Sequence, residues 1–421
     1  MSPPQPRARG KPPRRRLTWV GPEVLTAASD NDPTNVGTAV LVGAQTGYQL
    51  SWVALLVAPM LSVVLAIAAQ VGIVARSDLQ SLVVKHYGQR VARVLLASIV
   101  LVNLITIAAD LQAGAVGIGV LAGKGANWFV LPLGVALVGL LLIGRYDEVV
   151  AVLRYVLIGF LAFGAAAILA HPAWLHVLRG SLVPTLSLRP DALAGALALL
   201  GTTLTTYVYL WETISVGVEE KAESSSRVDR LRRSKVSAVI GAIFTAIILW
   251  FMLITSAATL GRHHEKVATA QDAAQALRPI AGSLAADLFA VGLITSAVVA
   301  LPVLMVTTAY VVGAEFNWRR GVFEKVSHAQ GFYATLAASI ALAAAVDLAG
   351  VPVLGTLIAA SVIGGLGTPI GMVLLVRLAR NPQVMGDQPI SARLAISGWT
   401  VTVVVGGFGL LYIVWAVLGL F

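Results

Sequence analysis

The chain has 421 residues, of which 57% are hydrophobic and only 12% are charged. Soluble globular proteins carry roughly twice that share of charged residues, so the composition excludes a soluble domain and indicates a membrane protein. The absence of cysteine excludes disulfides and thiolate metal sites. A formal net charge of +10 would suit nucleic acid, but the basic residues lie in short tracts between apolar segments, which membrane topology explains.

The apolar segments predict an all-α polytopic protein, because about 20 apolar residues make one crossing. Residues 1–17, rich in Pro and Arg, are expected to form a disordered basic cytoplasmic tail, and residues 18–421 a single transmembrane domain. We expect about eleven spans, near residues 18–46, 51–75, 94–122, 128–144, 150–170, 192–218, 237–260, 283–313, 331–349, 354–376 and 394–417.

The distribution of basic residues predicts the orientation in the membrane. With the N-terminus inside, 24 of the 30 Lys and Arg residues fall in cytoplasmic segments. Cytoplasmic loops of membrane proteins carry such an excess. We therefore expect a cytoplasmic N-terminus and, with an odd number of crossings, an extracellular C-terminus.

The first span contains a cluster of polar residues at Asp30, Asn31, Asp32 and Asn35. A charge at mid-membrane depth costs roughly 2.5–3.5 kcal/mol, so it usually lines a cavity or binds something. Pro33 removes a backbone donor and frees carbonyl oxygens, which with Asp32 and Asn35 would be hard ligands for a cation. The alternative is that Asp32 or Asn31 only caps a half-helix that begins at Pro33.

The sixth span contains a second polar interruption. Gly201 opens it, four threonines follow at 202, 203, 205 and 206, and Tyr207 ends it. Each threonine alone could bond its own i−4 carbonyl or a neighbouring helix, but the group predicts an unwound segment.

The two interruptions lie five crossings apart, which predicts an inverted repeat. Because five is odd, two five-helix units, approximately residues 18–170 and 192–376, would be inverted relative to each other, with 394–417 as an additional helix. In such an architecture, half-helix ends and unwound backbone meet at the midplane and hold a substrate.

Three further acidic residues are candidates for a permeation or proton path. Asp30 belongs to the first interruption, and Asp110 lies at mid-depth in the third span, where it must face a cavity or a partner. Glu212 lies about two turns beyond the second interruption. It could line an exit path, carry protons or form a structural ion pair.

The motif Asp32-Pro33-Thr34-Asn35 resembles the Asp-Pro-Gly-Asn signature of the NRAMP divalent-metal transporters, and the segments Gly21-Pro22 and Gly43–Tyr48 also fit. The resemblance runs over nearly the whole chain. Segments 270–282, Ala300–Leu304 and Val218–Glu220 resemble in particular the NRAMP-related magnesium transporters. The resemblance implies a LeuT-like fold.

The resemblance also implies a set of metal ligands. The family's ligands in span one fall on Asp32 and Asn35, and its Met-Pro-His in span six falls on Thr205, Thr206 and Tyr207. We expect Asp32, Asn35, Thr205 and Tyr207 to hold the metal. Without the sulfur ligand only oxygen donors remain, which favours Mg²⁺ as the bound metal and Mn²⁺ as the second choice. The histidine that assists proton coupling in the family is absent here, so whether transport is coupled to protons stays an open question.

This chain also departs from the magnesium branch, which tends to have Gly where Asn35 stands and Gln where Glu212 stands.

These observations predict a secondary transporter that imports divalent cations across the plasma membrane by alternating access. It would be neither an enzyme nor a nucleic-acid binder, would need no cofactor, and would have the metal ion and the lipid bilayer as partners. The oligomeric state stays open. The alternatives are a LeuT-fold symporter for a small organic solute, which the acidic interruption disfavours, and a transport-dead membrane sensor, which would normally carry a cytoplasmic signalling domain.

Overall fold

The computed structural model describes residues 22–143, 156–185, 187, 189–219, 226–263, 282–322, 324–351 and 353–418. Within these ranges the regular structure is entirely helical, as predicted. The predicted tail at 1–17 lies outside them. The helices of the first half are α1 (Pro22–Ser29), α2 (Pro33–Thr46), α3 (Ser51–Ala75), α4 (Leu79–Ala122), α5 (Asn127–Ile143), the 3₁₀ turn η1 (Leu157–Phe160), α7 (Leu161–Leu169) and α8 (Trp174–Leu182).

The second half has the same general plan of long helices with one interruption. Its elements are α9 (Pro190–Thr203), α10 (Thr206–Ile214), the π-helical turn η2 (Ser215–Glu219), α11 (Arg227–Ala258), α12 (Leu260–His263), α14 (Ser283–Glu315), α15 (Gln330–Leu348), α16 (Val353–Arg380), α17 (Pro382–Met385) and α18 (Ala392–Val417).

Eight helices of the described ranges are long and apolar enough to cross a membrane, and the bent pair around α7 and α8 would make nine. These account for eight or nine of the eleven predicted spans. The first predicted span is divided between α1 and α2, and the fourth is the shorter α5. Each of the eleven predicted spans therefore corresponds to a helix or to a broken helix.

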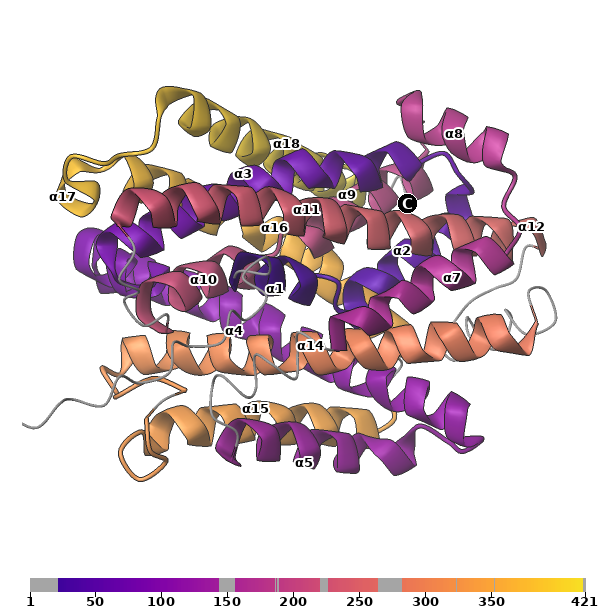
Figure 1. Cartoon of the computed structure of the whole chain (residues 1–421), viewed down its shortest axis with the longest axis horizontal. Coiled ribbons are helices and arrows are strands. Elements are labelled where there is room, and N and C mark those ends of the chain that lie inside the picture. The colour runs from indigo at the N-terminus through magenta and orange to yellow at the C-terminus, as the bar shows by residue number, and fades with distance from the viewer. Residues whose placement is uncertain are drawn as a thin grey trace, which may run out of the picture.

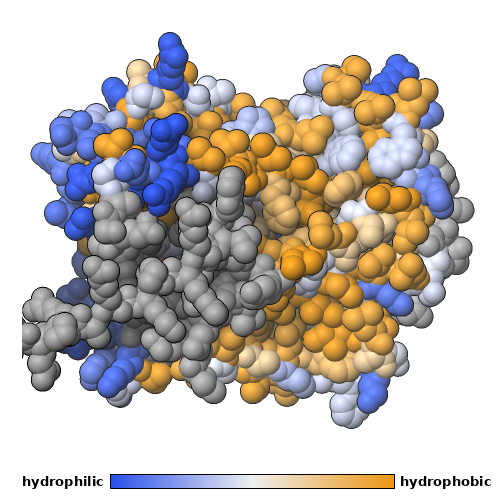
Figure 2. Space-filling view, viewed as in Figure 1, coloured by the Kyte–Doolittle hydropathy of each residue, from blue (hydrophilic) through white to orange (hydrophobic). Residues whose placement is uncertain are grey.

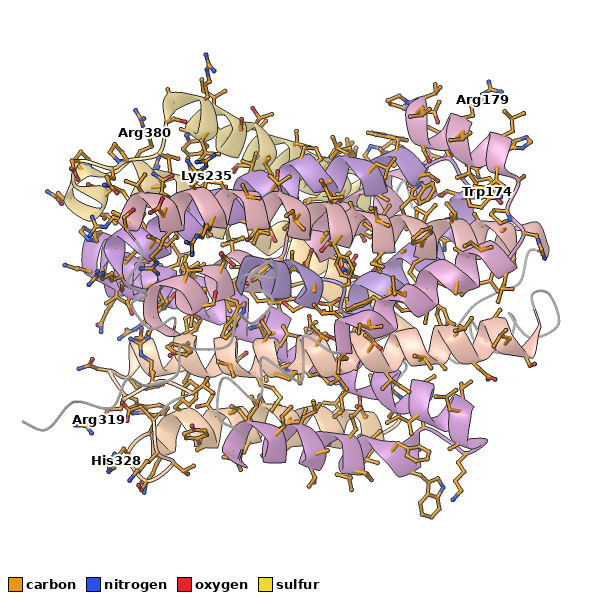
Figure 3. All side chains as sticks on the ribbon, in the orientation of Figure 1. Trp174, Arg179, Lys235, Arg319, His328 and Arg380 are labelled. Atoms are coloured by element: carbon orange, nitrogen blue, oxygen red, sulfur yellow. The ribbon has the colours of Figure 1, made fainter. Side chains whose placement is uncertain are left out.

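The surface agrees with a membrane protein whose long helices run parallel to its longest axis (Figure 1). Apolar side chains cover the middle of the molecule, and hydrophilic ones gather at one end, near α17 and the start of α11 (Figure 2). Lys235, Arg319 and Arg380 lie at that end, which we call the basic end, whereas Trp174 and Arg179 lie at the opposite end (Figure 3).

Two connections are more structured than the sequence suggested. The segment before the third predicted span is helical from Leu79, because Asp78 caps it by accepting a hydrogen bond from the Ser81 amide at 2.9 Å. Gly88, with φ of 80°, separates this short helix from the long one. The segment between the predicted spans at 150–170 and 192–218 contains α8, which turns by 118° from the helix before it.

The two interrupted spans lie together in the centre of the bundle. Helices α1 and α2 pack against α10 and α9 respectively, and α3, α4, α11, α14 and α16 surround them. Close approach is possible because small residues lie at the crossings. At Gly43 of α2, a Cβ atom would lie 2.3 Å from the Leu253 carbonyl oxygen of α11. Helix α2, which follows the first interruption, is thus packed tightly against α11.

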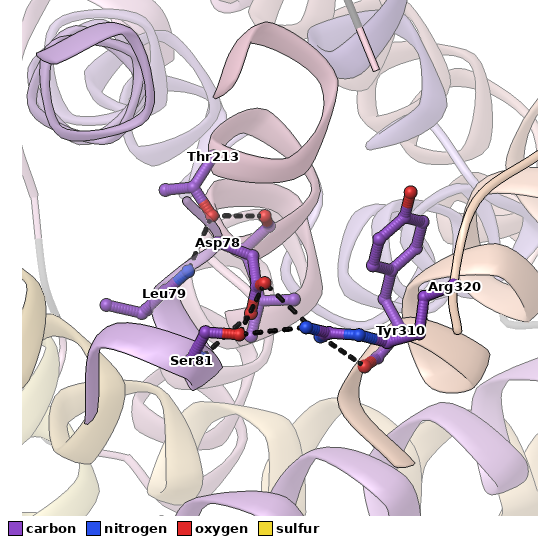
Figure 4. A network of polar contacts seen from close by, with 7 residues as sticks. Asp78, Leu79, Ser81, Thr213, Tyr310 and Arg320 are labelled. Atoms are coloured by element: carbon purple, nitrogen blue, oxygen red, sulfur yellow. Dashed lines mark hydrogen bonds and ion pairs between the residues drawn. The ribbon is translucent and has the colours of Figure 1, made fainter. Parts of the chain in front are cut away.

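A polar network joins four elements at the basic end (Figure 4). The Arg320 guanidinium donates to Asp78 Oδ2 at 3.3 Å, to the Tyr310 carbonyl at 3.1 Å and to Ser81 Oγ at 3.1 Å. Thr213, at the end of α10, accepts a hydrogen bond from the Leu79 amide at 3.0 Å. The connection after α14 is thereby tied to the start of α4, which is itself tied to α10.

Candidate functional site

The interruption between α1 and α2 is set by Asp32 and Pro33. Asp32 has extended backbone geometry, and its Oδ1 accepts a hydrogen bond from the Asn35 amide at 2.6 Å, while Pro33 takes the first helical position. The capping alternative is therefore correct for one carboxylate oxygen. The other oxygen, Oδ2, faces α10 and accepts a hydrogen bond from the Tyr207 hydroxyl at 3.0 Å.

The carbonyl oxygens at the end of α1 are bonded by side chains of other helices. The Tyr207 hydroxyl of α10 lies 3.1 Å from the Ser29 carbonyl and shares its single proton between that oxygen and Asp32 Oδ2. Thr245 of α11 donates to Ala27, and Ser296 of α14 donates to Asn31. Buried carbonyl oxygens need such partners, because an unsatisfied backbone group in the membrane is costly. The end of α1 is thus tied to three neighbouring helices.

Asn35 contacts both interrupted spans. Its Nδ2 donates to the Asp30 carbonyl at 2.7 Å, and its Oδ1 lies 3.3 Å from Thr203 Oγ1. The Thr203 hydroxyl has one proton and lies closer, at 2.7 Å, to the Leu199 carbonyl. The amide oxygen of Asn35 therefore keeps acceptor capacity for a cation.

The second interruption is shorter than predicted. Helix α9 continues through Thr203, and the break consists of Leu204 and Thr205, the latter extended at the start of α10. Thr203 bonds its own i−4 carbonyl, which was the alternative reading for these threonines. Thr205 and Thr202 have buried Oγ1 atoms without a hydrogen-bond partner in the described ranges.

Asp110 of α4 contacts the first turn of α2. Its Oδ1 accepts hydrogen bonds from the Thr34 amide at 2.9 Å and from the Thr34 hydroxyl at 2.7 Å. Two carboxylates, those of Asp32 and Asp110, thus bind amide groups at the positive end of α2. Oδ2 of Asp110 is buried and has no hydrogen-bond partner among the described residues.

The remaining acidic candidates lie in different places. Asp30 is completely buried within the first interruption, and both of its carboxylate oxygens lack a hydrogen-bond partner in the described part of the chain. Glu212 is completely buried on α10, beyond Thr205 and Tyr207 and next to Thr213.

The candidate residues Asp32, Asn35, Thr205 and Tyr207 offer oxygen and nitrogen atoms, and none of them carries a sulfur or an imidazole. Asp32 contacts both Asn35 and Tyr207 through hydrogen bonds. Thr205 occupies the N-cap position of α10, the helix that carries Tyr207. Nowhere in the described ranges do three acidic or histidine side chains converge closely enough to hold a metal ion. A cation here would depend on one or two carboxylates, neutral oxygens and water.

The structure adds residues that the sequence did not single out. Thr34, Thr245 and Ser296 position the first interruption. Thr34 could have been found from its place inside the Asp-Pro motif. Thr245 and Ser296 lie in ordinary apolar helices, where one hydroxyl residue gives no distinct signal.

Comparisons with known proteins agree with this geometry. A family model described as natural resistance-associated macrophage protein-like (Nramp) matches residues 23–415. The divalent metal cation transporter MntH of Deinococcus radiodurans is 27% identical over 413 residues, covering 96% of this chain and 91% of that protein.

Solved structures with the same fold include the manganese transporter of Eremococcus coleocola, with a TM-score of 0.73 at 19% identity. The match covers 93% of this chain and 85% of the other. Mhp1, a transporter of the nucleobase-cation-symport-1 family, has a TM-score of 0.57 at 15% identity, covering 93% and 90%. These similarities show the LeuT-like fold that the sequence predicted.

Proposed function

Because the chain belongs to the natural resistance-associated macrophage protein-like (Nramp) family, we propose that it imports divalent metal cations across the plasma membrane by alternating access. Mg²⁺ is the proposed main substrate and Mn²⁺ the second. The Deinococcus radiodurans relative is a divalent metal cation transporter and the Eremococcus coleocola neighbour a manganese transporter, which supports the substrate class.

The observation that carries the proposal is the position of Asp32. Its carboxylate is buried where the two interrupted spans meet, with one oxygen capping α2 and the other directed at Tyr207. A buried carboxylate with no basic partner in the described ranges is suited to a cation. Asn35 and Thr205 would add neutral oxygen ligands.

The preference for Mg²⁺ is proposed from the kind of ligand. Thr205, Thr206 and Tyr207 offer hydroxyl groups, and no methionine or histidine lies at these positions. Hard oxygen ligands suit Mg²⁺ and Mn²⁺, whereas a thioether would favour softer transition metals.

The driving force is proposed to be the membrane potential. We place the basic end in the cytoplasm, because Lys235, Arg319 and Arg380 gather there (Figure 3). The C-terminus would then be extracellular. Inward movement of a divalent ion gains about 4.6 kcal/mol per 100 mV. Asp30, Asp110 and Glu212 stay candidates for a permeation or proton path, and we propose neither an enzymatic activity nor a cofactor.

Uptake into proteoliposomes tests the proposal. The purified chain should take up Mg²⁺ and Mn²⁺ in competition, with Ca²⁺ as a third ion. Asp32→Ala should abolish uptake while the protein stays folded, because loss of a cap alone costs only about 0.5–2 kcal/mol. Asp347→Asn is the control, since Asp347 is buried at the end of α15. A folded Asp32→Ala protein with unchanged uptake would exclude this site.

A further inference from the structure

We propose that Asp30 supplies the second negative charge of the cation site, so that Asp30 and Asp32 together balance one divalent ion. This inference rests on the proposed function, in which a divalent cation binds beside Asp32. It assigns Asp30 to the binding of the substrate itself instead of to a path that leads to or from the site.

The first observation is that Asp30 is buried without compensation. Both carboxylate oxygens are inaccessible and have no hydrogen-bond donor in the described ranges, and neither of the described ion pairs includes Asp30. Two other buried carboxylates have partners for at least one oxygen. Asp78 pairs with Arg320, and Asp110 accepts two hydrogen bonds from Thr34. A buried, unpaired carboxylate is costly, so its persistence suggests a ligand.

The second observation is that the backbone fixes Asp30 beside the proposed ion. Its amide donates to the Ala27 carbonyl at 3.3 Å, and its carbonyl accepts from Asn35 Nδ2 at 2.7 Å. The neighbouring Ser29 carbonyl lies 3.1 Å from the Tyr207 hydroxyl, which also contacts Asp32. Asp30 is therefore held at the same interruption as Asp32 and Asn35, which are the proposed ligands.

The third step is the charge of the complex. Asn35, Thr205 and Tyr207 are neutral, so Asp32 alone would leave one positive charge of a divalent ion uncompensated in a low-dielectric interior. Adding Asp30 makes the complex neutral. Because no three acidic side chains converge in the described ranges, the count stops at two carboxylates. Asp30 acts directly on the ion or through one of its bound water molecules.

The experiment measures Mn²⁺ binding to the purified full-length chain, with free Mn²⁺ followed by its electron paramagnetic resonance spectrum. The variants are Asp30→Asn, which removes the charge with little change of shape, Asp30→Glu, which keeps it, and Asp32→Asn. Asp347→Asn removes a different buried carboxylate and serves as the matched control. Melting temperatures are recorded for each protein with and without Mn²⁺.

We expect Asp30→Asn to weaken Mn²⁺ binding by about ten-fold or more, whereas Asp30→Glu and Asp347→Asn bind within about three-fold of the parent. Without metal, Asp30→Asn should melt at no lower temperature than the parent, because it replaces a buried carboxyl group that has no hydrogen-bond donor in the described ranges. It should also gain less stability from Mn²⁺. If Asp30→Asn does not fold, Asp30→Ser tests the same charge.

Parent-like Mn²⁺ affinity in a folded variant without the Asp30 charge would overturn the inference. If Asp32→Asn in the same series still abolishes binding, the proposed function stands and only the role of Asp30 is wrong. If the parent binds no Mn²⁺ and transports no divalent cation, the proposed function itself fails, and the inference fails with it.

Discussion

The Asp32 carboxylate shows how one side chain can have a structural and a functional role together. One oxygen caps α2, and the other faces Tyr207 across the meeting point of the two interrupted spans. A carboxylate has two oxygens with about four acceptor positions, so capping uses only part of its capacity. The capping and cation-binding interpretations of the sequence are therefore compatible.

At the same scale, Thr205→Met is predicted to change the metal preference. Thr205 Oγ1 is buried at the start of α10 with no hydrogen-bond partner in the described ranges. A thioether there would raise the affinity for Mn²⁺ or Cd²⁺ relative to Mg²⁺ by roughly ten-fold, or about 1.4 kcal/mol. Isothermal titration of the purified variant measures the ratio.

The control is Thr205→Val, which removes the hydroxyl without adding sulfur. It should weaken Mg²⁺ binding and bring no gain for Cd²⁺. An unchanged ratio in Thr205→Met would mean that position 205 does not face the ion.

At the scale of the elements, the start of α2 is positioned by another helix. Asp110 of α4 accepts hydrogen bonds from both the amide and the hydroxyl of Thr34. Because α2 carries Asp32 at its cap and Asn35 in its first turn, the contact with α4 fixes the ligands as well as the helix. A residue outside both interruptions thus determines the geometry of the site.

Asp110→Ala is therefore predicted to destabilise the protein. The buried amide and hydroxyl groups of Thr34 would lose their acceptor, at a cost of about 1–3 kcal/mol. A thermal denaturation series in detergent measures the loss. Asp110→Asn keeps an oxygen acceptor and should retain most of the stability. Equal melting temperatures for the alanine variant and the parent would contradict the proposed contact.

The network at the basic end leads to a second prediction at this scale. Arg320→Ala would leave the buried Asp78 carboxylate without its cation and would remove the donor to the Tyr310 carbonyl. We expect the free energy of unfolding to fall by about 3 kcal/mol. This value is at the low end for breaking a buried ion pair, because the Arg320 side chain is 21% exposed.

Hydrogen exchange should locate that loss in the segment from Leu79 to Tyr87 and at the end of α10, where Thr213 bonds the Leu79 amide. The neighbouring Arg319 is exposed, so Arg319→Ala should change stability by less than about 0.5 kcal/mol. Equal effects of the two substitutions would show that the network does not hold these elements together.

At the scale of the whole molecule, the absence of cysteine makes the proposed orientation directly testable. Single cysteines can be introduced at Lys235 and Arg319 of the basic end and at Arg179 of the opposite end, all of which are exposed. A membrane-impermeant maleimide should label Arg179→Cys in intact cells. It should label Lys235→Cys and Arg319→Cys only after permeabilisation. The reverse pattern would invert the proposed topology.

The sequence by itself determined the fold class and the two interruptions. Apolar segments of span length require helices in a membrane, because only helices or closed barrels satisfy every backbone group there. Asp32 and Pro33 set the first break through local chemistry alone, since a cap needs only its own first turn. The second break was located less well, because threonines are compatible with a helix: α9 continues through Thr202 and Thr203, and the Thr203 hydroxyl bonds the Leu199 carbonyl within it.

Only the tertiary structure decided which side chains share the site. Tyr207 lies 175 residues from Asp32 in sequence, and Asp110 lies 76 residues from Thr34. Such contacts depend on how helices pack, and helix periodicity does not encode them. Both Asp30 and Asp78 are buried acidic residues, but Asp78 is paired with Arg320, whereas Asp30 has no hydrogen-bond partner in the described ranges. That difference arises from packing because the cost of a buried charge depends on the groups that surround it.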